Sequence, residues 1–109
     1  MDIQLKKGIL EYLVLVVILK EDSYGYKIVK SISEYIDITE STLYPILKRL
    51  ETSEAVETYS VEHNSRLRKY YKITELGKVK LKLFLKDYDK FLEIYKFIKD
   101  TVELEESNE

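Results

Sequence analysis

The sequence predicts a mainly α-helical (α+β) fold of three short helices, a two-stranded β-hairpin and one long helix. Helix-type apolar segments fill residues 4–52, and two runs rich in β-branched and aromatic residues follow them. A heptad pattern then continues to residue 102. Only three glycines and one proline occur among 109 residues, which indicates few tight turns. This order of elements is typical of a winged helix-turn-helix domain, whose hairpin is the wing.

The first two helices are expected at residues 4–20 and from Tyr24 to about Ile36. The stretch ILEYLVLVVIL in the first is apolar on all sides, and its length and lack of alternation favour a buried helix over a strand. Such a helix is either the centre of the core or partly covered by a second subunit, and both interpretations stay open. Asp22 or Ser23 is the expected N-cap of the second helix.

The third helix is expected at residues 40–52, with Asp37 or Thr39 as N-cap of its opening stretch. Pro45 interrupts its hydrogen bonding, so the helix either carries the proline on an exposed face or begins there. Its inward face consists of Leu43, Ile46, Leu47 and Leu50, and its outward face of Ser41, Pro45, Lys48 and Thr52, flanked by Tyr44 and Arg49. Hydroxyl and cationic side chains of this kind contact phosphates and base edges of DNA.

The hairpin is expected to pair AVETYSVE with LRKYYKI across the loop HNSR. Its second half carries a cationic cluster of Arg66, Arg68, Lys69 and Lys72, interleaved with Tyr70 and Tyr71. A wing with such a cluster suits phosphate or minor-groove contact. The alternative interpretation is a solvated edge strand, where lysines oppose aggregation.

The long helix is expected at residues 74–102, with Thr74 as its cap. About 29 residues at 1.5 Å each extend roughly 43 Å, which is more than this domain can cover. An apolar seam at heptad spacing consists of Leu81, Phe84, Tyr88, Phe91, Tyr95, Ile98 and Val102. The seam predicts a homodimer, because soluble proteins rarely expose so large an apolar stripe. The alternative is that the helix folds back on the first helix.

The chain is therefore expected to form a winged helix-turn-helix DNA-binding domain at residues 1–73 and a dimerisation helix at residues 74–102, both in the same compact unit. The acidic tail at residues 103–109 is expected to be disordered. The net charge is −2, but without the four acidic residues of the tail it becomes +2. The longest apolar run, residues 12–19, is too short to span a bilayer, and a signal peptide fits poorly. We expect a cytoplasmic protein without a membrane partner.

The sequence predicts no enzyme, no metal site and no cofactor. It has no cysteine, its single histidine (His63) lies in a polar loop, and its three glycines cannot form a phosphate-binding loop. Ten tyrosines are present, and Tyr88 and Tyr95 lie on the seam. They line a site for a small aromatic effector between the subunits or simply pack there, because tyrosine is enriched at interfaces.

Four segments, YGYKI, STLYPILKRLE, RKYYKIT and TELG, resemble the signature segments of the PadR-like family of transcriptional regulators in order and spacing. The resemblance covers roughly residues 5–85. It implies a winged helix-turn-helix homodimer that binds double-stranded DNA and usually represses transcription, with the C-terminal helix as dimerisation arm. Carried over by position, the DNA contacts are Ser41, Thr42, Tyr44 and Lys48 on the third helix, Tyr24 at the start of the second, and Arg66, Arg68 and Lys69 in the wing.

Two positions depart from the family pattern. Glu54 stands where the family commonly has a glycine, and Leu67 replaces a proline often found in the wing. The turn before the hairpin and the geometry of the wing are therefore open. Together with the overall acidity, Glu54 favours an alternative function, a winged-helix module that binds protein and not DNA. If the DNA-binding interpretation is right, the twofold axis of the dimer predicts a pseudo-palindromic operator.

Overall fold

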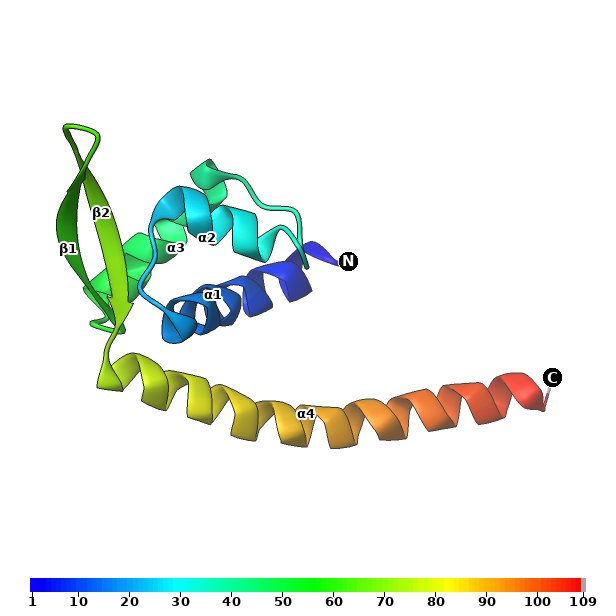
Figure 1. Ribbon diagram of the computed structural model, residues 1–109. Coiled ribbons are helices and arrows are strands. Elements are labelled where there is room, and N and C mark those ends of the chain that lie inside the picture. The colour runs from blue at the N-terminus through cyan, green and yellow to red at the C-terminus, as the bar shows by residue number, and fades with distance from the viewer. Residues whose placement is uncertain (109) are drawn as a thin grey trace.

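The computed structural model describes residues 1–108 and confirms the predicted order of elements (Figure 1). The first three helices gather into one cluster, the hairpin stands at its side, and the last helix runs beneath the cluster and extends far beyond it. None of the described helices is long and apolar enough to cross a membrane. The elements are α1 (Ile3–Lys20), α2 (Gly25–Ile32), α3 (Glu40–Thr52), β1 (Val56–His63), β2 (Arg66–Ile73) and α4 (Glu75–Ser107).

The core lies between α1, α2, α3 and the base of the hairpin. It buries the predicted inward face of α3 completely or nearly so, which confirms the helical period read from the sequence. The apolar stretch of α1 is buried on one side only, because Val16 and Leu19 remain exposed. The core side chains are Leu10, Val14, Leu15, Ile18, Ile28, Ile32, Ile38, Leu43, Ile46, Leu47, Leu50, Ala55, Val56, Tyr71, Ile73 and Leu81.

Both predicted ends of α2 were wrong. Tyr24 occupies the N-cap position, and neither Asp22 nor Ser23 caps the helix, because both are engaged with the hairpin. The helix ends at Ile32 instead of near Ile36, since a turn begins there with Tyr35 N donating to Ile32 O. This turn brings Ile38 back into the core.

The helix α3 begins at Glu40, so the interpretation that it starts at Pro45 was wrong. Thr39, not Asp37, occupies the N-cap position, and Pro45 lies inside the helix. The proline ring is on the exposed face. The Ser41 carbonyl, which loses its intrahelical donor, is therefore on the side open to solvent, where the loss costs less.

The hairpin has a tighter turn than the predicted four-residue loop. Its register pairs His63 with Arg66, so that only Asn64 and Ser65 form the turn. Both turn residues have a positive φ, at 51° and 65°. Two such residues match the type I′ turn that suits the twist of paired strands.

The turn from α3 into β1 is built on Glu54, whose φ is 64°. Glycine adopts this left-handed conformation easily. The backbone therefore has the shape expected for the glycine that is common at this position in the family, although the residue here is glutamate. The Glu54 carbonyl accepts a hydrogen bond of 2.7 Å from the Thr74 hydroxyl, and Thr74 Oγ1 in turn accepts from Gly77 N at 3.1 Å. Thr74 is thus the cap of α4, as predicted.

The first turns of α4 pack on α1. The Phe84 ring stacks on Tyr12 with 4.0 Å between the centroids, and Lys80 Nζ lies 2.8 Å from Glu11 Oε1. The helix then continues to Ser107, so the expectation of a disordered tail from residue 103 was wrong up to that residue, while Glu109 lies outside the described residues. The protruding helix gives a radius of gyration of 17.7 Å, against about 13 Å for a compact chain of this length.

Candidate nucleic-acid interface

The outward face of α3 is open along its whole length. Because Leu43, Ile46, Leu47 and Leu50 hold the opposite face in the core, the helix presents its small, hydroxylic and cationic side chains to solvent. The predicted contact residues of this helix are all exposed: Ser41, Thr42, Tyr44, Lys48 and Arg49.

Three elements meet in a groove of about 420 Å³ at the N-terminal end of this face. The groove brings together four predicted site residues that are far apart in the sequence: Tyr24, Tyr44, Arg68 and Lys69. Tyr44 reaches across it, with its hydroxyl 3.3 Å from Glu40 Oε2. Partial burial and the neighbouring Glu40 carboxylate raise the pKa of Tyr44, so this ring stays neutral at physiological pH.

The other predicted residues lie outside this groove. Lys48 and Arg49 line a second groove with Glu11 and Lys80 towards the start of α4. Arg66 lies at the tip of the wing, beside the turn. Within residues 1–108, these three cations make no salt bridge with a carboxylate, which leaves their charge available to an external anion.

Two wing cations are held by neighbouring elements. The Arg68 guanidinium lies over the Tyr24 ring, 4.1 Å from its centroid, and so joins β2 to the start of α2. Lys69 points to the other face of the hairpin, where its Nζ is 3.6 Å from Glu51 Oε1 of α3. Both cations are therefore positioned by the helices that flank the groove.

An aromatic cluster, the wing clamp, joins the hairpin to the loop between α1 and α2. It consists of Asp22, Tyr24, Tyr59 and Tyr70. Tyr59 and Tyr70 are cross-strand partners and stack at 5.5 Å between centroids, and Tyr24 meets Tyr70 edge to face at 5.4 Å. The Tyr59 hydroxyl donates a 2.7 Å hydrogen bond to Asp22 Oδ2, which raises the pKa of Tyr59 to about 12.

The wing clamp includes two residues that the sequence did not assign to the interface, Asp22, which was expected to be a helix cap, and Tyr59. They are separated by 37 positions, and no spacing rule relates residues so far apart. Two backbone hydrogen bonds between Ser23 and Tyr71, of 3.1 and 2.7 Å, add to the same junction. Leu67, the other departure from the family pattern, is exposed near the wing tip and takes no part in it.

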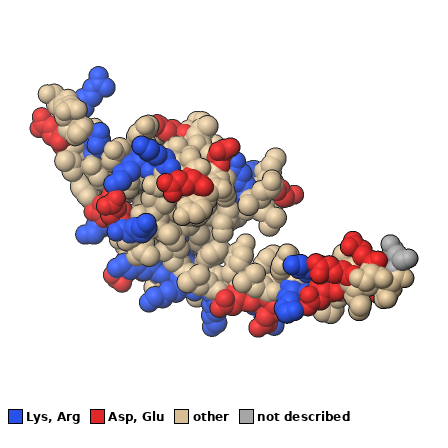
Figure 2. Space-filling model, turned by 45° about the vertical axis from the view of Figure 1, so that its right-hand side comes forward, with Lys and Arg blue, Asp and Glu red and all other residues tan. Residues whose placement is uncertain are grey.

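Charge is distributed unevenly over the molecule (Figure 2). Basic and acidic side chains are mixed on the wing and the winged domain, lysines line the first half of α4, and acidic side chains concentrate towards the far end of α4. Residues 75–86 carry a net charge of +3, and residues 100–108 a net charge of −4. A polyanion would therefore be attracted to the start of α4 and repelled by its far end.

The predicted dimer residues change from covered to exposed along α4. Leu81 is buried, and Phe84 and Tyr88 are half-buried in a chain of ring contacts that begins at Tyr12. The Phe91 ring still lies 5.2 Å from the Tyr88 ring of the same helix, between centroids, but Phe91, Tyr95 and Ile98 are about half exposed. The start of α4 thus packs on α1, as the alternative prediction stated, whereas the helix from Phe91 onward does not fold back on α1.

No group of three or more histidine, aspartate or glutamate side chains that could hold a metal ion occurs in residues 1–108. The groove beside α3 offers two cations and several tyrosine rings with their hydroxyls, next to one carboxylate, Glu40. Side chains of these kinds bind phosphates and bases.

Comparison with known proteins agrees with this geometry. A model of the transcriptional regulator PadR-like family matches residues 14–83. An uncharacterized protein of Lysinibacillus sphaericus is 39% identical over 93 residues, which are 81% of this chain and 85% of that protein. A PadR-like transcription factor from Bacteroides fragilis is 32% identical with a TM-score of 0.77, over 87% of this chain and 94% of that one.

A third comparison involves a structure determined with nucleic acid. Bacillus subtilis PadR, in complex with operator DNA, matches with a TM-score of 0.66 over 71% of this chain and 46% of that one. The two sequences are 24% identical, so this match shows a shared fold.

Proposed function

The chain belongs to the PadR-like family of transcriptional regulators, and on that basis we propose that it acts in the cytoplasm as a homodimer that represses transcription from a pseudo-palindromic DNA operator. The α3 face enters the major groove of each half-site, and the wing contacts the flanking backbone. The supporting observation is the exposed face of α3 beside a groove to which α2 and the wing contribute an aromatic ring and two cations.

The roles of the site residues follow from their chemistry and position. Ser41, Thr42 and Lys48 are exposed on α3, and Lys48 has no salt bridge in the described chain. We assign them to base edges or nearby phosphates. Tyr44 and Arg49 flank them. Arg66, Arg68 and Lys69 are assigned to the phosphate backbone, and Tyr24 contributes by holding Arg68 in place.

Dimerisation is supported by the unpartnered half of α4. Phe91, Tyr95, Ile98 and Val102 form an apolar stripe, and burying it against a second copy removes it from water. The charge asymmetry of the helix favours an antiparallel arrangement, because the end with net charge +3 then lies beside the end with net charge −4.

The function is tested by fluorescence anisotropy with DNA from the protein's own promoter region. We expect saturable binding whose affinity falls steeply as the salt concentration rises, because neutralised phosphates release counterions. Binding to a scrambled duplex should be weaker by at least about three orders of magnitude. Absence of binding, or an affinity independent of salt, would reject DNA binding and favour the protein-interaction module.

The assignment of roles within the interface has a separate test. Lys48→Ala should weaken operator binding and relax sequence preference if Lys48 reads a base, at a cost of about 1–3 kcal/mol. Arg66→Ala should weaken all duplexes similarly and lower the slope of log affinity against log salt by about one. Lys90→Ala on α4 removes the same charge far from the groove and is the matched control. Equal behaviour of all three variants would refute the assignment.

A further inference from the structure

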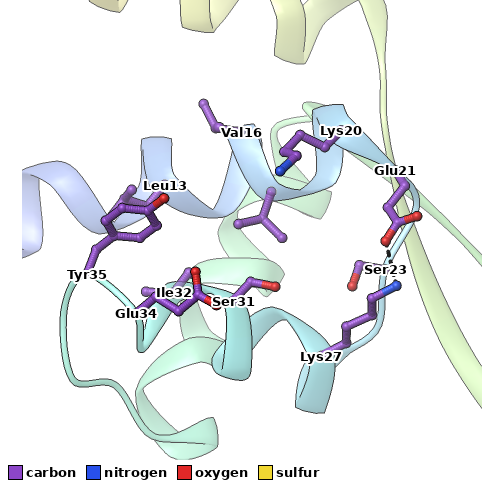
Figure 3. A pocket seen from close by; sticks show the side chains of 11 residues that line it. Leu13, Val16, Lys20, Glu21, Ser23, Lys27, Ser31, Ile32, Glu34 and Tyr35 are labelled. Atoms are coloured by element: carbon purple, nitrogen blue, oxygen red, sulfur yellow. Dashed lines mark hydrogen bonds and ion pairs between the residues drawn. The ribbon is translucent and has the colours of Figure 1, made fainter.

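One acidic side chain, Glu40, lies in the groove beside α3 together with the cations Arg68 and Lys69. The pocket between α1 and α2 shows the opposite arrangement, because its two glutamates equal its two lysines in number and Glu21 pairs with Lys27 (Figure 3). Glu40 takes part in no salt bridge within residues 1–108. An uncompensated negative charge therefore lies in an interface that we propose for a polyanion.

The position of this carboxylate is set by α3 and α2. Glu40 is the first residue of α3, directly after the Thr39 cap, and it is exposed. One turn later, the Tyr44 hydroxyl donates a hydrogen bond of 3.3 Å to Glu40 Oε2, and this hydroxyl lies close to Gly25 of α2. Within residues 1–108 the other oxygen, Oε1, accepts no hydrogen bond. A recognition helix contacts base edges with its N-terminal residues, so Oε1 is an available acceptor at the end of α3 that meets the bases.

DNA offers few groups that a carboxylate can bind. Phosphate oxygens only accept hydrogen bonds and carry the same sign of charge. In the major groove the only hydrogen-bond donors are the amino groups of cytosine (N4) and adenine (N6). The adenine amino group lies beside the acceptor N7, whereas the cytosine amino group lies beside a C5–H group. A carboxylate at this place therefore suits cytosine best.

We propose that Glu40 recognises one cytosine in each half-site, with Oε1 accepting a hydrogen bond from the cytosine N4 amino group. This inference rests on the proposed DNA-binding function and adds to it a residue that selects the sequence. At guanine or thymine the carboxylate faces acceptors, and near phosphates it is repelled, so duplexes without the cytosine bind less well. Glu40 thus increases specificity, whereas the cations of the interface increase affinity.

The structure also supplies a matched control for a second role of Glu40. A carboxylate in the first turn stabilises a helix through the helix dipole. Glu75 has this position in α4, where it directly follows the Thr74 cap just as Glu40 follows Thr39, and it is exposed. It is not among the residues that line the groove beside α3. Glu75→Gln therefore removes the same charge from the same helical position outside the interface.

Base preference is tested by selecting bound duplexes from a randomised library with the full-length wild type, Glu40→Gln and Glu75→Gln. A glutamine side chain forms paired hydrogen bonds with adenine N6 and N7. In Glu40→Gln we therefore expect one position of each half-site to change from cytosine to adenine, with the other positions as in the wild type. Glu75→Gln should retain the wild-type preference. An unchanged preference in Glu40→Gln would overturn the proposal, and an equal loss of Tm in both variants would then assign Glu40 to helix stabilisation.

Affinities measured by fluorescence anisotropy give a second readout. Replacing the recognised cytosine in the selected operator should weaken wild-type binding roughly tenfold and leave the binding of Glu40→Ala almost unchanged. Glu40→Ala should also bind a scrambled duplex severalfold more tightly, because a charge that repels phosphates is gone. Weaker binding of this variant to every duplex would contradict the assignment. A wild type that binds no duplex refutes both proposals, whereas failure of the Glu40 tests alone leaves DNA binding intact.

Discussion

Two of the three glycines lie where a side chain has no room, but the obstacle differs. A Cβ at Gly77 would lie 2.2 Å from the Ala55 carbonyl oxygen, which is backbone and cannot move aside. A Cβ at Gly25 would lie 2.8 Å from the Tyr44 hydroxyl, the free end of a side chain in the proposed interface. At Gly8 no described atom lies within 4 Å. One chemical change, a single methyl group, thus meets three different environments.

Alanine at these positions should separate stability from DNA binding. Gly77→Ala should lower the free energy of unfolding by about 1–3 kcal/mol through overpacking. Gly25→Ala should change it little but weaken DNA binding severalfold, because Tyr44 is displaced. Gly8→Ala should raise it by about 0.5–1 kcal/mol, as expected in a helix interior. Urea denaturation measures the free energy of unfolding, and fluorescence anisotropy measures DNA affinity. A Gly25→Ala variant that is destabilised but binds DNA normally per folded molecule would contradict the expected role of Tyr44.

Glu54 offers a test of backbone strain at a single residue. Its φ of 64° costs a residue with a Cβ about 1–2 kcal/mol. Replacement by glycine removes this strain, but the greater flexibility of glycine in the unfolded chain offsets about 0.5–1 kcal/mol of the gain. Glu54→Gly should therefore stabilise the protein modestly in thermal denaturation at fixed protein concentration. Glu54→Ala keeps the strain and is the control, and stabilisation of equal size in both variants would assign the effect to the lost charge.

Among the elements, the hairpin depends most on contacts outside itself. Tyr59→Phe keeps the ring on Tyr70 but removes the hydrogen bond to Asp22. We expect faster hydrogen exchange of the β1 and β2 amides and unchanged exchange in α1. Val61→Thr, also exposed on β1, serves as the control, and unchanged exchange of the strand amides in Tyr59→Phe would show that the clamp does not hold the wing.

The same tyrosine predicts a pH dependence at the level of the hairpin. Because its hydroxyl donates to Asp22, the pKa of Tyr59 rises to about 12 in the folded chain from 10. Between these two values the unfolded chain has lost the proton and the folded chain retains it, so stability falls as pH rises from 10 to 12. The unfolding midpoint should decline less over this interval in Tyr59→Phe than in the wild type. Parallel declines would contradict the raised pKa.

The elements also show what a sequence can predict. The inward face and the end of α3 follow from its sequence because its apolar residues recur at one helical spacing. Its start did not, since Pro45 left two possible starting points. The end of α2 does not, since Tyr35 continues the helical spacing while the chain turns after Ile32 to bury Ile38. The two-residue turn was missed because Asn64–Ser65 lacks the glycine that usually marks such turns. The exposed face of α3 was predicted from periodicity, and the wing clamp was not, because its contacts are long-range.

For the whole molecule, the apolar half of α4 predicts the oligomeric state. Phe91→Glu should convert a dimer into a monomer in sedimentation velocity at micromolar concentration, because it places a carboxylate in the buried stripe. The winged domain should keep its helical circular dichroism, while operator affinity is lost. Lys90→Glu adds the same side chain one position away from the seam and should remain dimeric. A monomeric wild-type protein would end the dimer proposal.

The protruding α4 also determines how the regulator responds to its own abundance. In the proposed dimer, the exposed apolar stripe of one subunit is covered only by a second copy, so the amount of the DNA-binding form is set by mass action. At protein concentrations below the dimer dissociation constant, the amount of dimer rises with the square of the amount of chain, so a twofold change in synthesis gives about a fourfold change in dimer. If the protein is the dimeric repressor that we propose, the length of this helix makes repression respond to gene dosage more steeply than repression by a monomer would.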